Sequence, residues 1–239
     1  MNIDWVLAWP AITNSPIFGM GITLLSYEFG RFLYLKSGGF ALFQPILVSV
    51  MVIGFVLMSM GIPYDVYFKQ AESFHLFLGP LTVALAIPLY INIKRIRQLL
   101  GRILVTLIVG GTASIGSAML VLWIMGGSED IILSMAAKSV TTPIAISITE
   151  EIGGYPSLAV TFVIAIGILG VAIGPWFLRL IGVTEPSAKG FALGITSHAL
   201  GTAKALEMGD QVGAFSALAM GLMGIASALA LPWLAQYFL

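Results

Sequence analysis

The chain has 239 residues, of which 59% are hydrophobic and 9% are charged, and its acidic and basic residues balance at 11 each. A soluble domain carries roughly 25% charged residues, so this composition excludes an ordinary soluble protein. The balanced charge offers no basic surface for nucleic acid, and the lack of cysteine excludes disulfides and thiolate sites. We therefore expect an all-α, polytopic membrane protein of the plasma (inner) membrane.

Tryptophans stand near the start of the chain, before the first long apolar segment. Trp5 and Trp9 suit the membrane–water interface, where amphipathic rings accumulate. The first ten residues, MNIDWVLAWP, contain no basic residue and carry Asp4. We therefore expect no cleaved signal peptide here.

Long apolar segments follow one another along the chain, and each approaches or exceeds the roughly 20 residues that a helix needs to cross hydrocarbon. They lie near residues 16–36, 42–61, 74–93, 102–126, 157–180 and 211–236. Two shorter segments, 131–152 and 187–208, are amphipathic and interrupted. The pattern predicts about six to eight membrane segments in a single domain over residues 1–239.

The densest basic cluster of the sequence indicates the orientation in the membrane. Lys94, Arg95, Arg97 and Arg102 lie close together and are expected on the cytoplasmic side by the positive-inside rule. If segment 131–152 dips into the membrane and returns, the basic loop 179–189 is also cytoplasmic. If it crosses fully, that loop lies outside. Charge placement favours a re-entrant segment, and both alternatives stay open for 131–152 and 187–208.

Two parts of the sequence resemble each other. Residues 78–90 read LGPLTVALAIPLY, and residues 138–150 read KSVTTPIAISITE. Both combine Thr, Pro and small apolar residues, and both precede a glycine-rich span. Matching interruptions are typical of repeat-built transporters with a central site, which predicts an inverted repeat with halves of about 16–126 and 131–239. The alternative is that proline and glycine are simply common in membrane helices.

The first interrupted segment contains the run KSVTTP. Pro143 disrupts the preceding helical turn, and a helix that begins there presents free N–H groups and a positive dipole end. Such a helix start binds anions, with Lys138 nearby as counter-charge. The alternative is a helix cap at the membrane surface, with Lys138 reaching lipid headgroups. The candidate substrate-binding residues here are Lys138, Ser139, Thr141, Thr142 and Pro143.

The second interrupted segment repeats this chemistry, with a cation, hydroxyl groups and glycines. Helical spacing places His198 and Thr202 on one face, and Lys204 and Glu207 can pair. His198 can contact a substrate hydroxyl or carry a coupled proton; the alternatives are a structural histidine and an interfacial lysine. The candidates are Ser197, His198, Gly201, Thr202 and Lys204. Because both segments combine a cation, hydroxyls and a helix break, we expect them to build one substrate site, in which a buried lysine needs an anion.

No catalytic pattern is present in the sequence. It contains no zinc-binding His-Glu-x-x-His helix, nucleotide loop or Gly-x-Ser-x-Gly elbow. Two histidines without cysteine make a metal site unexpected. We expect a protein that is not an enzyme and has no cofactor, with coupling to H⁺ or Na⁺ left open.

Four long motifs together resemble the LrgB/CidB family from about residue 16 to the end of the chain. They are FLGPLTVALAIPLY (77–90), KSVTTPIAI (138–146), TEEIGGYPSL (149–158) and GFALGITSHALGTAKALE (190–207). The resemblance extends to the C-terminal part of a plastidal glycolate/glycerate translocator.

The resemblance implies a transporter of small monocarboxylates such as glycolate, glycerate, lactate or pyruvate. It also implies a small LrgA/CidA-like membrane partner on a separate chain. The alternative that it implies is an antiholin-like regulator of murein hydrolase export and cell lysis, without a substrate pocket. The glycine- and alanine-rich last span can in addition support a homo-oligomer.

Overall fold

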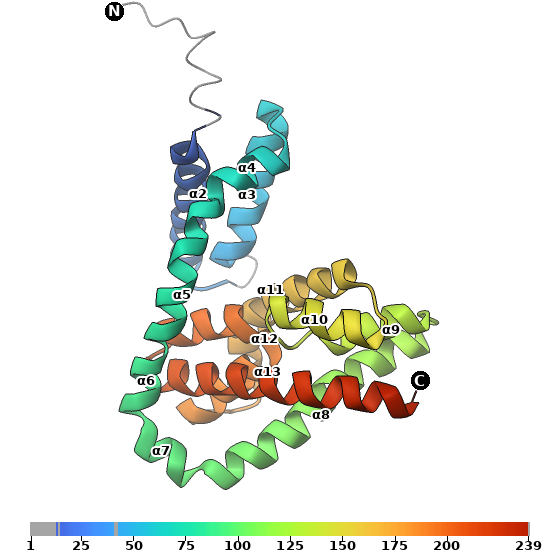
Figure 1. Cartoon of the computed structure of the whole chain (residues 1–239). Helices are drawn as coiled ribbons and strands as arrows, with labels where there is room; N and C mark the ends of the chain where they lie inside the picture. Colours follow the sequence, from blue (N-terminus) through green and yellow to red (C-terminus); the bar gives the residue numbers. More distant parts are fainter. Residues whose placement is uncertain (1–12, 14, 41–42, 239) are drawn as a thin grey trace, which may run out of the picture. The chain divides into compact units, whose positions relative to one another are not determined.

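The computed structural model describes residue 13, residues 15–40 and residues 43–238, so Trp5 and Trp9 lie outside the described part (Figure 1). These described residues form helices joined by short connections, with no strand among them, which confirms the all-α class. The chain divides into two compact units, residues 1–84 and 85–239. Each unit is described by itself.

The first unit contains a close helix pair. Its elements are α2 (Pro16–Lys36), α3 (Pro45–Met60), α4 (Tyr64–Ala71), the 3₁₀ turn η2 (Glu72–Phe74) and α5 (His75–Ala84). Ser15 and Gln44 cap α2 and α3 through side-chain oxygens, as expected at helix N-termini. A Cβ at Gly30 would lie 2.7 Å from the carbonyl oxygen of Pro45, so glycine allows α2 and α3 to approach.

The second unit holds both interrupted segments between long helices (Figure 1). Its elements are α6 (Ala86–Ile91), α7 (Ile93–Gln98), α8 (Leu100–Ile124), α9 (Glu129–Ala136), α10 (Thr142–Ile152), α11 (Pro156–Leu180), α12 (Pro186–Glu207) and α13 (Asp210–Phe238).

The number of membrane segments differs from the prediction of six to eight. Among the described residues, three helices are long and apolar enough to cross a membrane, namely α8, α11 and α13, or up to four if the bent pair Tyr64–Phe74 and Gly79–Ile91 forms one span. Helix α3 has only 16 residues, which gives about 24 Å against a hydrocarbon core of about 30 Å. Segment 74–93 is divided among α5, α6 and α7, and the interrupted segments turn back.

Helices α9 and α10 form a helical hairpin, called hairpin 1 (residues 129–152). The backbone N–H of Tyr155, just after α10, donates to Ser134 Oγ of α9 at 2.7 Å. The Tyr155 hydroxyl donates to the carboxylate of Asp130, in the first turn of α9, at 3.1 Å. The chain therefore leaves hairpin 1 beside the place where it entered.

Helix α12 also reverses direction, and it is called hairpin 2 (residues 186–207). The reversal occurs at His198, whose φ of 40° and ψ of −124° are not helical. Beyond it, Gly201 lies so close to the carbonyl oxygen of Leu193 that a Cβ would overlap it. In a continuous helix, two residues eight apart are separated by about 12 Å along the axis, so the two halves of α12 fold onto each other.

The packing of hairpin 2 against α13 confirms the reversal. Contacts of the first half run in the same order as α13, and contacts of the second half run in the opposite order. The first half pairs Gly190 with Val212 and Gly194 with Ser216, and the second half pairs Thr202 with Ser216 and Leu206 with Gly213. Between helices in a membrane, van der Waals packing contributes to association in place of the hydrophobic effect, and glycine allows the close approach that this packing needs.

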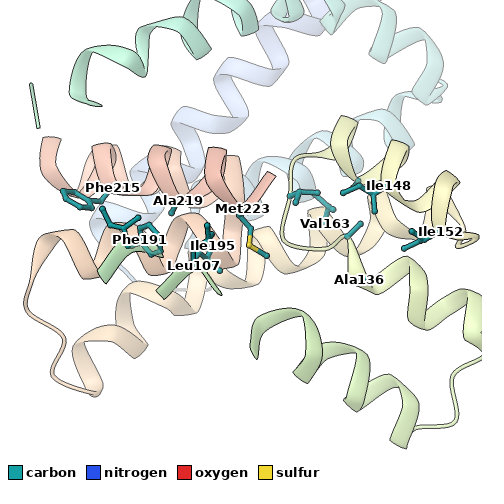
Figure 2. Close-up of a cluster of buried hydrophobic side chains, with 14 of the residues drawn as sticks. Leu107, Ala136, Ile148, Ile152, Val163, Phe191, Ile195, Phe215, Ala219 and Met223 are labelled. Carbon is teal, nitrogen blue, oxygen red and sulfur yellow. The ribbon is translucent and has the colours of Figure 1, made fainter. Parts of the chain in front are cut away.

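One apolar core joins both hairpins to the long helices of the second unit. Figure 2 shows Phe191 and Ile195 of hairpin 2 beside Leu107 of α8 and Met223 of α13. The same cluster includes Ile148 of hairpin 1. The core thus fixes where the tips of the two hairpins lie.

Candidate functional site

The tip of hairpin 1 buries a lysine among hydroxyl groups. Lys138 is 6% exposed, and Ser139 and Val140 beside it are fully buried. The Lys138 ammonium donates to Ser114 Oγ of α8 at 2.9 Å and to Ser139 Oγ at 3.0 Å. Ser114 lies near the middle of the 25-residue helix α8, so hairpin 1 ends at about half the depth of this span.

Helix α10 begins beside this lysine with an open N-terminus. Thr141 is the N-cap residue with extended backbone, and its side chain makes no capping hydrogen bond. Thr142 and Pro143 form the first turn, as the sequence predicts, with Thr141 and Thr142 half-buried and Pro143 exposed. The first-turn N–H groups and the dipole therefore add positive potential near Lys138.

The tip of hairpin 2 is held by α11. His198 is 4% exposed, and its Nε2 lies 3.0 Å from the carbonyl oxygen of Val163, which fits donation by an Nε2–H tautomer. Gly167 leaves room for the imidazole, and Gly170 leaves room for the fully buried Ser197. These α11 residues lie in the central part of a 25-residue helix, so hairpin 2 also ends at mid-depth.

The two tips approach each other from opposite ends of α11. Hairpin 1 ends just before α11 begins, and hairpin 2 begins just after α11 ends. Val140, two residues after Lys138, packs in the same apolar cluster as Val163, whose carbonyl oxygen contacts His198. The structure thus brings Lys138 and His198 into one region of the second unit.

Other candidates from hairpin 2 have structural partners. Thr202 donates to the carbonyl oxygen of His198 at 2.9 Å and lies 3.0 Å from Ser216 Oγ of α13. Gly201 packs against the backbone of the first half of hairpin 2. Lys204 lies in the last turn of α12 and pairs with Glu207 at 2.7 Å. Lys204 is therefore not placed with Lys138 at the tips.

Sequence reasoning missed the residues of α8 and α11 that receive the tips. These residues are Ser114, Val163, Gly167 and Gly170. Ser114 carries a weak signal as a polar residue inside a long span. Thr112 and Ser117 of the same helix give the same signal, yet their hydroxyls bond to backbone carbonyls of α8.

An apolar cavity of about 550 Å³ lies between α8, α9 and α13. Ile115, Leu133, Met223 and Ala230 contribute to its lining, and Ser227 is one of its few polar residues. None of the residues predicted to bind substrate lines this cavity.

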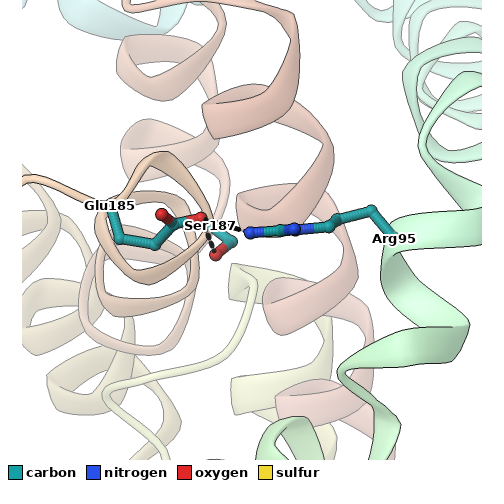
Figure 3. A network of polar contacts seen from close by, with 3 residues as sticks. All are labelled: Arg95, Glu185 and Ser187. Atoms are coloured by element: carbon teal, nitrogen blue, oxygen red, sulfur yellow. Dashed lines mark hydrogen bonds and ion pairs between the residues drawn. The ribbon is translucent and has the colours of Figure 1, made fainter.

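At the surface, an ion pair joins α7 to the start of hairpin 2 (Figure 3). Arg95 lies 3.1 Å from a carboxylate oxygen of Glu185, which also accepts from the Ser187 hydroxyl at 2.9 Å. The Ser187 hydroxyl and the Arg95 guanidinium hold the pKa of the Glu185 carboxyl below its ordinary value of 4.5. The residues described contain no group of three side chains that could hold a metal ion.

Two comparisons with known proteins point to the same family. The model of the LrgB-like family matches residues 23–237. Antiholin-like protein LrgB from Bacillus mycoides (strain KBAB4) and from Bacillus cereus (strain B4264) are each 34% identical to this chain over 223 residues. Each match covers 93% of this chain and 96% of the relative. No solved structure matches the chain. The chain therefore belongs to the LrgB-like family of membrane proteins.

Proposed function

We propose that this chain transports small monocarboxylates, of the glycolate, glycerate, lactate or pyruvate type, across the plasma membrane. The observation that carries the proposal is Lys138, a buried cation at the tip of hairpin 1. No carboxylate among the described residues pairs with it. A buried charge without a counter-ion is costly, and an organic anion supplies the missing charge.

The surroundings of Lys138 support an anion more than a cation. The N-terminus of α10 contributes donors and a positive dipole end. Thr141, Thr142 and Ser197 would offer hydroxyls to the substrate, and His198 would contact a substrate hydroxyl or carry a coupled proton. The proposal includes coupling of transport to either H⁺ or Na⁺.

The hairpins give the proposal a transport path. Hairpins that enter from opposite ends of α11 form an inverted arrangement, span–hairpin–span–hairpin–span, over residues 100–238. Transporters with inverted repeats place the substrate between such elements and expose it to each side in turn. The boundary between repeats would thus lie near α11. This differs from halves of 16–126 and 131–239 and is compatible with one functional domain.

The charges at the two ends of the second unit give the proposed orientation. Glu129, Asp130, Glu150 and Glu151 lie at the base of hairpin 1. Basic residues gather at the opposite end, in 94–102 and 179–189. The positive-inside rule therefore places the base of hairpin 2 in the cytoplasm and the base of hairpin 1 outside.

A second candidate function is antiholin-like regulation of murein hydrolase export and cell lysis. The names of the relatives favour it over monocarboxylate transport. In this function the chain would assemble with an LrgA/CidA-like partner or with further copies of itself, and no pocket would be required. The two functions are compatible if regulation responds to the transported anion.

Uptake by reconstituted vesicles tests the main proposal. Vesicles that contain the chain, with and without an LrgA/CidA-like partner, are given labelled glycolate, lactate or pyruvate. We expect uptake by the wild type, loss of uptake with Lys138→Met, and normal uptake with the control Lys94→Met, which removes an exposed lysine. Absence of uptake in both wild-type preparations would reject transport.

A lysis assay addresses the second candidate. Cells that express the wild type or Lys138→Met are compared for release of cell-wall hydrolase activity. A pure regulator tolerates Lys138→Met and His198→Ala, because no substrate contacts either side chain. Loss of regulation together with loss of uptake would connect the two functions.

A further inference from the structure

We propose that Ser114 of α8 binds the substrate carboxylate together with Lys138, so that the anion bridges hairpin 1 and a neighbouring span. This inference rests on the proposed transport function and assigns a residue that the sequence does not single out. Ser114 is half-buried, and its hydroxyl faces the Lys138 ammonium from a different element.

The hydrogen-bond count at the tip carries the inference. A lysine ammonium has three N–H donors and no acceptor. Two of them go to Ser114 and Ser139, and the described residues supply no acceptor for the third. The two serine oxygens lie 3.3 Å apart, so one hydroxyl donates to the other. The hydroxyl that accepts this bond keeps its own hydrogen free to donate.

The cluster therefore offers one N–H and one O–H without acceptors, and it contains one positive charge. Buried donors that stay unpaired are unfavourable, and a charged donor more so. The two free donors belong to atoms 2.9–3.0 Å apart. A carboxylate has two adjacent acceptor oxygens and one negative charge, so a single carboxylate satisfies both donors and the charge.

Among the residues of the cluster, Ser114 is the one that lies outside hairpin 1, so it can make anion binding depend on the position of α8 as well. Ser139 follows Lys138 directly in the chain and moves with it. Ser114 stands 24 residues earlier, on α8. An anion that contacts both Lys138 and Ser114 therefore binds only while hairpin 1 lies beside α8. A transport cycle would change the position of hairpin 1 relative to α8 and thereby the affinity for the anion.

Binding of glycolate to the purified full-length chain, measured by calorimetry, tests the inference. We expect Ser114→Ala to raise the dissociation constant roughly tenfold, as for loss of a hydrogen bond to a charged group. Ser114→Thr retains the hydroxyl and should stay within about threefold of the wild type. Ser117→Ala on the same helix is the matched control and should bind glycolate like the wild type.

In vesicles, Ser114→Ala should raise the KM for glycolate uptake more than it lowers the maximal rate. If Ser114→Ala does not insert, Ser114→Gly removes the same hydroxyl. Wild-type binding that Lys138→Met abolishes but Ser114→Ala leaves unchanged would overturn this inference and leave transport standing. If the wild type binds none of glycolate, lactate and pyruvate, the transport proposal itself falls.

Discussion

His198 Nε2 and the carbonyl oxygen of Val163 lie 3.0 Å apart, and this contact joins the tip of hairpin 2 to the middle of α11. The carbonyl of Val163 belongs to a helical turn, so the imidazole adds a second partner to a backbone group. The backbone of His198 has a positive φ, a conformation that residues other than glycine rarely adopt, and the bond to Val163 helps to hold it there.

Two replacements of His198 should distinguish the backbone strain at this position from its hydrogen bond to Val163. Both His198→Ala and His198→Gly remove the bond to Val163, which is worth about 0.5–1.5 kcal/mol. Only glycine also removes the strain of a positive φ, which is about 1–3 kcal/mol. We expect the glycine variant to be more stable than the alanine variant by about 1 kcal/mol in reversible unfolding in detergent. Equal stability of the two variants would show that the tip is not strained.

Close packing between hairpin 2 and α13 should make Gly190 intolerant of a side chain. A Cβ at Gly190 would overlap the carbonyl oxygen of Val212, so Gly190→Ala forces the backbones apart at a cost of about 1–3 kcal/mol. Gly221 of α13 meets nothing within 4 Å, so Gly221→Ala serves as the control and should be neutral or slightly stabilising. Thermal unfolding of the two variants measures the difference.

A designed disulfide should confirm that hairpin 1 returns to its entry side. A Cβ at Gly154 would lie 3.0 Å from Ser134 Oγ and 2.8 Å from the Ser134 backbone nitrogen, so a cysteine pair can form here once the two backbone segments move slightly apart. The natural chain has no cysteine, so Ser134→Cys with Gly154→Cys contains a single pair. Oxidation should consume both thiols, counted by mass spectrometry. If the segment crossed as one helix, the two positions would be about 30 Å apart and both thiols would stay free.

Thiol labelling from each side of the membrane tests the proposed orientation. Single cysteines at Glu151→Cys and Thr184→Cys mark the bases of hairpins 1 and 2. We expect an impermeant reagent to label Glu151→Cys in intact cells and Thr184→Cys only after the cells are opened. Labelling of both positions from outside would contradict the opposed entry of the hairpins.

The stability of the α7–hairpin 2 contact should depend on pH through Glu185. Its pKa is lowered in the folded protein by Ser187 and Arg95, so the contact stabilises the fold above the ordinary carboxyl pKa. The stabilisation is lost as pH falls through the lower folded value. Unfolding temperatures of the wild type and Glu185→Gln should therefore differ at neutral pH and converge in acid. A constant difference across this range would assign the effect to packing instead of charge.

The sequence predicts the unusual segments well because polar runs inside an apolar chain have few explanations. Residues 131–152 and 187–208 coincide with hairpins 1 and 2, and Pro143 stands in the first turn of α10 as expected. The helix break in the second segment falls at His198, which no local propensity singles out. Periodicity cannot give this position, because it depends on the fit between the imidazole and Gly167 of α11.

The residues that contact the tips of the two hairpins cannot be predicted from the sequence for a similar reason. Ser114 becomes a neighbour of Lys138 only once hairpin 1 packs against α8. The sequence makes Lys204 a candidate substrate-binding cation like Lys138, and the structure pairs it with Glu207 in the last turn of α12. The number of spans was overestimated because apolar length alone does not show whether a segment crosses, bends or returns.

The glycine contacts of hairpin 2 have a mechanical consequence. Backbones that touch without intervening side chains cannot slide past each other without overlap, so hairpin 2 and α13 form one rigid piece. Any rearrangement of the second unit must then move hairpin 2 and α13 together.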